Sequence, residues 1–175
     1  IKILKDFFMK LHTSILLSTI VLISACSSHK DRALFNSAAE KSKAKNYSEA
    51  LKDYQEIIND YSGSEKAPES IFSVAAMYHM NQIPNVPKEE SLKKAVEYYQ
   101  KLYQQFPKDE RAPKALFMSG FILANELRNI DAARLTYQQF LDKFPKHELA
   151  TPARTELDNL GKTPEEILQQ QTAKK

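Results

Sequence analysis

The sequence is poor in the residues that many enzyme folds and disulfide-rich domains need. It contains three glycines, one cysteine and no tryptophan among 175 residues. Glycine supplies the positive-φ positions of tight turns and phosphate-cradling loops, so a β-sandwich, a Rossmann domain or a P-loop enzyme of this size would normally have more. One cysteine excludes an intramolecular disulfide framework and a multi-cysteine zinc site. The composition favours an all-α fold and argues against nucleotide chemistry.

The sequence also lacks a block of charges of one sign. The formal net charge is +3, of which +2 belongs to residues 1–25 and +1 to the other 150 residues. Basic and acidic residues are mixed along this longer part. A nucleic-acid-binding protein needs clustered Lys and Arg to neutralise several phosphates. We therefore expect no nucleic-acid partner.

Motifs of catalysis and metal binding are missing as well. His29, His79 and His147 are scattered, with no pair at the spacing that would hold a metal on one helical face. Glu89 and Glu90 open a predicted helix, where acids usually serve the helix dipole instead of acid–base catalysis. We therefore predict a protein that is not an enzyme, with no catalytic residue, no cofactor, no metal and no small-molecule substrate.

Residues 1–25 have the organisation of a secretory signal peptide. Basic residues precede an apolar run from Ile15 to Ile23, and small residues follow it. A helix over residues 11–25 would rise about 22 Å at roughly 1.5 Å per residue, which is short of a hydrocarbon core of about 30 Å. A permanent transmembrane helix is therefore disfavoured. Since Ile1 is not a natural initiator, we expect the protein to start at Met9, with residues 1–8 upstream of it.

Residues 23–26, Ile-Ser-Ala-Cys, resemble the lipobox of bacterial lipoproteins. The resemblance implies that Cys26 is lipidated and that residues 26–30 form a short tether. Two or three acyl chains would anchor the protein durably, because each buried CH₂ contributes about 0.8 kcal/mol. Ser27 is not the aspartate that retains some lipoproteins in the inner membrane, so the sorting rule implies the periplasmic face of the outer membrane. An ordinary signal peptide that ends near an unrelated cysteine is the alternative.

The rest of the chain repeats a pattern of alanine and aromatic residues. Each copy has an alanine, a tyrosine four residues later, an apolar residue three further on and an aromatic residue after four more. These steps place all four side chains on one face of a helix. The copies begin at Ala50, Ala95 and Ala133.

A second pattern precedes each copy and pairs two bulky residues with a small one a turn later. The pairs are Leu34-Phe35, Ile71-Phe72 and Leu116-Phe117, and the small residues are Ala38, Ala75 and Gly120. Asn46 and Asn129 lie four residues before an alanine, where we expect a left-handed backbone in a tight turn. Two prolines within residues 80–89 predict an enlarged loop there.

The two patterns predict three helix–turn–helix units, at residues 31–62, 67–107 and 112–145. They resemble the tetratricopeptide repeat, which has small residues at its eighth and twentieth positions and often a proline near its end. The resemblance implies an all-α, right-handed superhelix. Ile57, Leu102 and Phe140 stand where the family usually has a third small residue, so the packing there must be looser or differently angled.

Residues 146–175 are predicted to close the array with a capping helix, a short last helix and a frayed tail. Pro152 suits a helix start, and Thr155 and Glu156 stand in place of the bulky pair. Gly161 is expected to end the capping helix, and Thr163 to cap the last one.

In solenoids of this kind the first helix of each unit lines a concave binding face. The exposed candidates for protein contacts on these helices are Asn36, Lys43, Tyr78, Phe121 and Asn125.

A lipidated N-terminus joined to such repeats, with the Phe-Pro to Ala-Pro junction of residues 106–115, resembles the BamD family of outer-membrane lipoproteins. That family has about five repeats, against about three here. The resemblance implies a scaffold in β-barrel assembly that holds periplasmic domains of the barrel insertase or of other assembly lipoproteins. One alternative is a cell-envelope coordinator of the CpoB/YbgF kind, linked to division or peptidoglycan synthesis, although the coiled coil of that group is missing between Ser27 and Lys30. An envelope hydrolase or substrate-binding lipoprotein is a third alternative, which the motif search supports least.

Overall fold

The computed structural model describes residues 29–173, in which every regular element is a helix. The predicted signal segment, with Cys26, lies outside the described residues. A first helix covers residues 29–43. The remaining elements are α2 (Tyr47–Asp60), α3 (Ala67–His79), α4 (Lys88–Gln105), α5 (Ala112–Phe121), the π-helix η1 (Ile122–Glu126), α6 (Ile130–Lys143), α7 (Ala150–Asn159) and α8 (Pro164–Ala173). The all-α prediction is confirmed.

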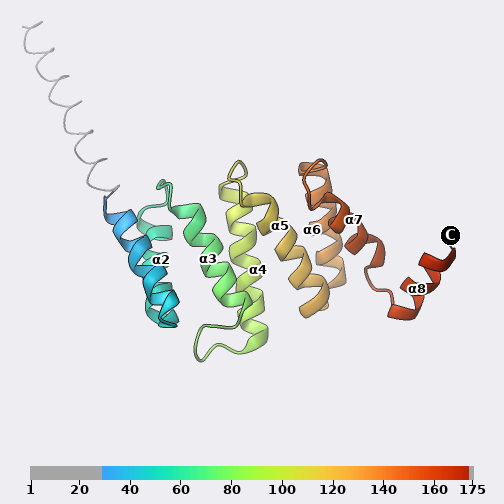
Figure 1. The fold of residues 1–175 in the computed structure, drawn as a ribbon, viewed down its shortest axis with the longest axis horizontal. Helices are drawn as coiled ribbons and strands as arrows, with labels where there is room; N and C mark the ends of the chain where they lie inside the picture. Colours follow the sequence, from blue (N-terminus) through green and yellow to red (C-terminus); the bar gives the residue numbers. More distant parts are fainter. Residues whose placement is uncertain (1–28, 174–175) are drawn as a thin grey trace, which may run out of the picture.

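The helices form antiparallel pairs that stand side by side in one row (Figure 1). Helix 29–43 pairs with α2, α3 with α4, and α5–η1 with α6. The first helix of each pair lies on the viewed side of the row, and the second lies behind it. This arrangement is a tetratricopeptide-like solenoid, as the two sequence patterns predicted.

An aromatic pair recurs inside each unit and explains why the two patterns occur together. Each pair joins the phenylalanine of the bulky doublet to the tyrosine of the alanine pattern, with ring centroids 5.4–5.7 Å apart and planes at 59–66°. Such tilted or edge-to-face contacts contribute about 0.5–1.5 kcal/mol beyond area burial. The pairs are Phe35–Tyr54, Phe72–Tyr99 and Phe117–Tyr137.

The positions at which the repeat family usually has a third small residue are filled by large side chains. Ile57, Leu102 and Phe140 are fully buried. Phe140 makes ring contacts with Phe117, Phe144 and His147. These residues thus occupy core volume between helices.

The turns inside the first and third units contain the expected left-handed residue, but one position earlier than predicted. Lys45 has a φ of 61° and Arg128 a φ of 54°, whereas Asn46 and Asn129 have φ values of −82° and −89°. The prediction for the two asparagines is therefore wrong, because they begin the next helix. Asn129 caps α6 by accepting a hydrogen bond from the backbone N–H of Ala132 at 3.2 Å.

The second unit has the enlarged loop that its prolines predicted, together with a longer second helix. α4 has 18 residues, whereas α2 and α6 each have 14. Ile83 of the loop is buried. Ser91, in the additional first turn of α4, donates a hydrogen bond to the carbonyl of Tyr78 at 2.6 Å.

The end of the array differs in register from the sequence prediction by one residue. Backbone N–H groups at Ala67, Ala112 and Ala150 donate to carbonyls three residues earlier in each junction, at 2.9–3.1 Å. Ala150 therefore corresponds to the first residue of α3 and α5, so Arg154 and Thr155, not Thr155 and Glu156, replace the bulky pair. Polar side chains at these positions are typical of a solenoid cap.

The last turn and helix follow the predicted chemistry. Gly161 follows α7 with a φ of 78°, a conformation that glycine adopts readily. Thr163 and Glu166 form a reciprocal capping box at the start of α8, with distances of 2.7 and 3.3 Å. α8 lies at the end of the row, away from α2, α3 and α4 (Figure 1).

Candidate functional site

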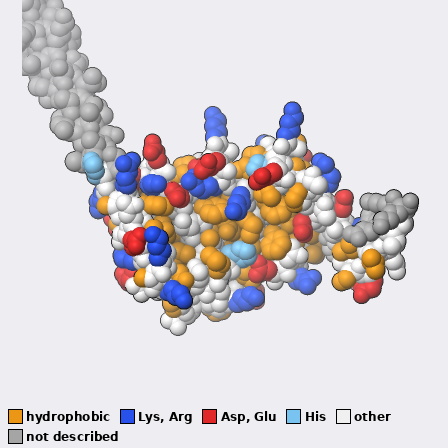
Figure 2. All heavy atoms as spheres, viewed as in Figure 1, with side chains coloured by type: hydrophobic (Ala, Val, Ile, Leu, Met, Phe, Trp, Pro, Cys, Tyr) orange, Lys and Arg blue, Asp and Glu red, His pale blue; other side chains and the backbone are white. Residues whose placement is uncertain are grey.

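The first helices of the units present one continuous surface, which we call the first-helix face. It comprises helix 29–43, α3, α5, η1 and α7, and it is the side viewed in Figures 1 and 2. Two positions of each first helix contribute side chains to this face, one three residues before the small residue and one directly after it. The two positions are four residues apart and therefore lie on one side of the helix. These positions hold Phe35, Ala39, Phe72, Ala76, Phe117 and Phe121.

The middle of the first-helix face is apolar. Figure 2 shows hydrophobic atoms gathered over α3 and α5, with charged side chains towards the upper and lower edges. Phe72, Phe117 and Phe121 are all half-buried. The third unit has phenylalanine at position 121, where the first two have alanine, so the apolar surface is bulkiest on α5. A partly exposed apolar surface with a polar rim is typical of a protein-binding site.

Two lysines partly cover this aromatic surface. The Lys66 ammonium lies 4.5 Å from the ring centroid of Phe35, and that of Lys114 lies 5.7 Å from the ring centroid of Phe72. A cation over an aromatic ring is stabilised by the quadrupole of the ring. Lys66 also pairs with Glu69 at 3.1 Å, whereas Lys114 forms no ion pair within residues 29–173.

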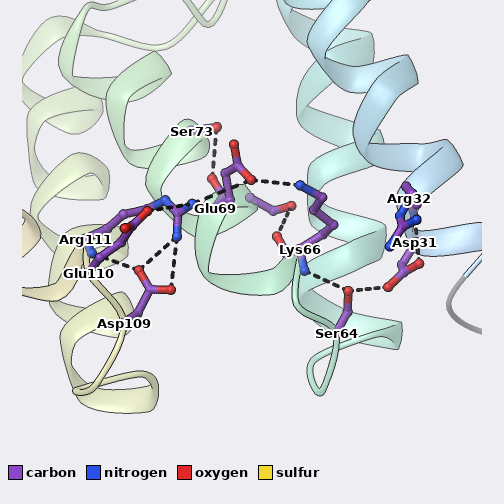
Figure 3. Close-up of polar contacts among 10 residues, drawn as sticks. Asp31, Arg32, Ser64, Lys66, Glu69, Ser73, Asp109, Glu110 and Arg111 are labelled. Carbon is purple, nitrogen blue, oxygen red and sulfur yellow. Dashed lines mark hydrogen bonds and ion pairs between the residues drawn. The ribbon is translucent and has the colours of Figure 1, made fainter.

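The edge at which consecutive units join carries a chain of polar contacts (Figure 3). Asp109 accepts two hydrogen bonds of 3.0 Å from the Arg111 guanidinium, which also lies 3.7 Å from Glu69 of the preceding unit. At the previous junction Ser64 donates to buried Asp31. The contacts therefore link the first helices of neighbouring units at this edge.

The three junctions also share one local hydrogen bond, although the side chains that accept it differ. In each, a side-chain acceptor receives the backbone N–H two residues later, at 2.9–3.1 Å. The acceptor is a hydroxyl in Ser64, a carboxylate in Asp109 and the Nδ1 atom in His147. This hydrogen bond fixes the backbone conformation just before each following helix, in the manner of an N-terminal cap.

The opposite edge, where each first helix ends, is linked by two further contacts. Nε2 of His79 lies 2.6 Å from Oε1 of Glu126, which joins the end of α3 to η1. The Asn125 amide lies 3.5 Å from Oε2 of Glu156 on α7. The apolar centre of the face is thus bounded by polar contacts at both edges.

The predicted contact residues fall into three groups. Asn36, Lys43 and Asn125 are exposed, and Phe121 is half-buried. Tyr78 is only 5% exposed, so the expectation that it lies on the exposed surface is wrong. Three residues beyond the small position, a side chain faces the second helix of its own unit. Tyr78 accordingly stacks on Tyr98 of α4, with centroids 5.8 Å apart.

Burial changes the titration of several tyrosines beneath this surface. It raises the pKa of Tyr99 to about 12 and also raises the pKa of Tyr78, with Tyr98 and Glu90 adding to the second effect. The pKa of Tyr137 is raised as well, first by burial and then by Glu156. The Tyr137 hydroxyl is buried without a hydrogen-bond partner among the described residues. We therefore expect all three hydroxyls to stay neutral at physiological pH.

Two grooves lie beside η1. One, of about 610 Å³, is bordered by η1, the start of α6 and the α7–α8 connection, and includes Asn125, Arg128 and Glu156. The other, of about 660 Å³, lies between the first turns of α4 and η1, with Leu92, Val96 and Leu123 among its lining residues. The sequence patterns gave no signal for either groove.

The described residues show neither a metal site nor a membrane span. No group of three or more His, Cys, Asp or Glu residues in this part of the chain could hold a metal ion. None of the helices from residue 29 onward is both long and apolar enough to cross a bilayer.

Comparison with known families matches residues 114–147 to the tetratricopeptide repeat. This stretch coincides with the third helical pair, from the first turn of α5 to just beyond α6. No curated protein matches the sequence. A repeat of this type supports a role as a scaffold for protein partners, and proteins built from such repeats are typically not enzymes.

Proposed function

We propose that this protein is a lipid-anchored scaffold on the periplasmic face of the bacterial outer membrane. In this role Cys26 carries the anchor, and the solenoid holds proteins that take part in β-barrel assembly. The partners are periplasmic domains of the barrel insertase or of other assembly lipoproteins.

The observation that carries the binding role is the apolar centre of the first-helix face. Half-buried Phe72 lies on α3, and half-buried Phe117 and Phe121 lie on α5. Hydrophobic atoms gather over these two helices, between charged edges (Figure 2). Burying such aromatic side chains against a partner releases apolar surface from water, and aromatic residues dominate the energetics of many interfaces. The polar contacts at the edges hold the helices in fixed relative positions, so the surface needs little reordering on binding.

The anchor and the assembly role rest on sequence features. The lipobox-like residues 23–26 support lipidation of Cys26, and Ser27 supports the outer membrane as the destination. The junction of residues 106–115, between the second and third helical pairs, supports the likeness to BamD lipoproteins.

The anchor is tested by fractionating cells that produce the full chain. We expect the wild-type protein in the outer-membrane fraction and Cys26→Ala in the soluble periplasmic fraction. Ser27→Ala keeps the thiol and is the matched control, which should remain in the membrane fraction. Retention of Cys26→Ala in the membrane would overturn the lipid anchor.

The partner is tested by placing a photo-crosslinking amino acid at position 121 of the full chain in living cells. We expect adducts with the barrel insertase or its lipoproteins. The same probe at Leu135, which is 73% exposed on α6, should give far fewer adducts. Adducts with only peptidoglycan synthases or Tol–Pal components would favour the envelope-coordinator alternative. Equal labelling from both positions would contradict binding at the first-helix face.

A further inference from the structure

We propose that the C-terminal part of the first-helix face binds an acidic amphipathic helix of a protein partner. This inference rests on the proposed function, because it assigns a ligand chemistry to the same face. The surface consists of the stripe Lys114, Phe117 and Phe121 together with the adjoining groove that includes Arg128. We call it the α5 stripe and groove.

The stripe is built by helical spacing. Lys114, Phe117 and Phe121 are separated by three and four residues and therefore lie on one side of α5. Gly120 is fully buried against Tyr137, whereas its neighbour Phe121 is half-buried and is not part of the central core. The stripe thus presents a bulky apolar side chain that the fold covers only in part.

Cations lie at both ends of this apolar surface. Lys114 stands in the first turn of α5, and Arg128 lies in the turn after η1. Both side chains are exposed, and neither forms an ion pair within residues 29–173. By contrast, Lys66 and Arg111 at the neighbouring junctions are both engaged by carboxylates.

One carboxylate borders the groove, and it already has a contact inside the protein. Glu156 is half-buried and lies 3.5 Å from the Asn125 amide. Arg128 and Lys162 outnumber Glu156 among the charged residues that line the groove, so the net charge at this end is positive. Lys114 makes the other end of the stripe positive as well. The complementary ligand has acidic residues at its ends and apolar residues between them.

The length of the surface suits a short helix. Lys114 and Arg128 are fourteen residues apart along α5, η1 and the following turn, so they are separated by less than the roughly 20 Å that an α-helix of this length would span at about 1.5 Å per residue. A partner helix of about fourteen residues would span this distance. Its apolar residues, one turn apart, would pack against Phe117 and Phe121 in the manner of a helix bound in a hydrophobic groove.

The experiment uses three synthetic peptides of fourteen residues with the same helix-forming apolar face. One has two acidic ends, one has an acidic and a basic end, and one has two basic ends. Binding to residues 26–175 attached to supported lipid through Cys26, as in the anchored protein, is measured by surface capture of fluorescently labelled peptide. We expect the wild type to prefer the doubly acidic peptide, by roughly fivefold for each charge exchanged.

Charge reversal in the protein should shift this preference. Lys114→Glu should favour the mixed peptide, and Lys114→Glu combined with Arg128→Glu should favour the doubly basic one. The matched control is Arg134→Glu with Lys143→Glu, which makes the same change in net charge on exposed positions of α6. Its preference should remain that of the wild type. An equal shift in the control would show that only net charge matters and would overturn the proposal.

Two further variants separate the apolar contribution and protect against misfolding. Phe121→Ser should weaken the doubly acidic peptide about tenfold, whereas Leu135→Ser, on exposed α6, should not. Arg128→Asn removes the charge with a residue that tolerates the left-handed backbone at this position, and should weaken acidic peptides without favouring basic ones. Circular dichroism must show native helicity for each variant.

The outcomes also distinguish this inference from the proposed function. The acidic-helix proposal is overturned if no peptide binds saturably, or if a peptide whose helix is interrupted by proline binds equally well. If position 121 still crosslinks to envelope proteins in that case, the scaffold role stands and only the ligand chemistry is wrong. If the crosslinks are missing as well, both fail.

Discussion

A methyl group added at Gly120 would lie 3.0 Å from Cε1 of Tyr137 and 3.1 Å from its Cδ1. Tyr137 is fully buried and cannot move away, because its ring also packs against Phe117. The third unit therefore needs glycine at a position where the first two have Ala38 and Ala75. The close approach of α5 to α6 is the reason for the substitution.

Gly120→Ala should therefore destabilise the protein by about 1 kcal/mol, even though alanine favours helix formation over glycine by a similar amount. The overpacking against Tyr137 must exceed the propensity gain. Urea unfolding monitored by circular dichroism measures the difference. Gly63→Ala is the control, because nothing lies within 4 Å of a methyl group there. Equal stability of the two variants would contradict the packing argument.

Tyr137→Phe should leave the protein as stable or stabilise it by up to about 1 kcal/mol. The buried hydroxyl has no hydrogen-bond partner in the described structure, so its removal ends a desolvation cost without breaking a bond. Tyr98→Phe is the comparison, because the Tyr98 hydroxyl accepts a hydrogen bond from Gln55 at 3.3 Å. That variant should lose stability. A clear loss in Tyr137→Phe would reveal a partner for its hydroxyl.

Stability should fall in alkali through the buried tyrosines. The folded-state pKa of Tyr99 is about 12, above the value of about 10 of an unfolded chain, so the folded form holds the proton more tightly. The contribution of Tyr99 to the free energy of unfolding is therefore fully present below about pH 10 and is lost as the pH rises from about 10 to 12. Tyr99→Phe should reduce the slope of unfolding free energy against pH in this range.

Asp109→Ala should cost about 1–2 kcal/mol, because Asp109 accepts from both the backbone and the side chain of Arg111. Asp109→Asn retains an oxygen acceptor for the backbone N–H and should cost less. The free energy of unfolding in denaturant is the measurement. Asp142→Ala, at an exposed position of α6, is the control and should change stability by less than about 0.5 kcal/mol. If Asp109→Ala is equally mild, the junction contacts contribute little.

Much of the fold could be predicted because its main contacts repeat with local spacing. The four-residue step from Ala133 to Tyr137 and the pairing of Leu116 with Phe117 each fix one helical face. Joining those faces gives the Phe117–Tyr137 pair and its counterparts in the other units. The periodicity of apolar side chains thus specifies which faces are buried, even though it carries no distances.

The site was less predictable because neighbouring positions on a helix face different elements. Tyr78 and His79 are adjacent in sequence, yet Tyr78 is buried against α4 and His79 reaches Glu126 on η1. A rotation of about 100° per residue decides between these environments. The polar contacts between units also join residues far apart in sequence, as in the pairing of Arg111 with Glu69. No local pattern reveals such pairs.

The π-helix η1 was not predicted, although the sequence contains a signal for it. The distance from Ala38 to Ala50 is twelve residues, whereas that from Gly120 to Ala133 is thirteen. Left-handed Lys45 and Arg128 each lie five residues before the alanine, so the extra residue has to lie before them. The wider winding of η1 absorbs it.

The π-helix therefore gives the third unit tolerance to a change of length. A one-residue insertion in an α-helix would rotate every later side chain by about 100° and misalign the next helix. In the third unit the insertion lies at the end of the first helix: the Asn129 N–H donates to the carbonyl of Leu123, six residues earlier, whereas the Asn46 N–H donates to that of Lys41, five residues earlier. A repeat can thus differ in length by one residue without a change in how its helices pack against those of its neighbours. A unit of this design can accommodate an extra residue at the end of its first helix while its neighbours remain in place.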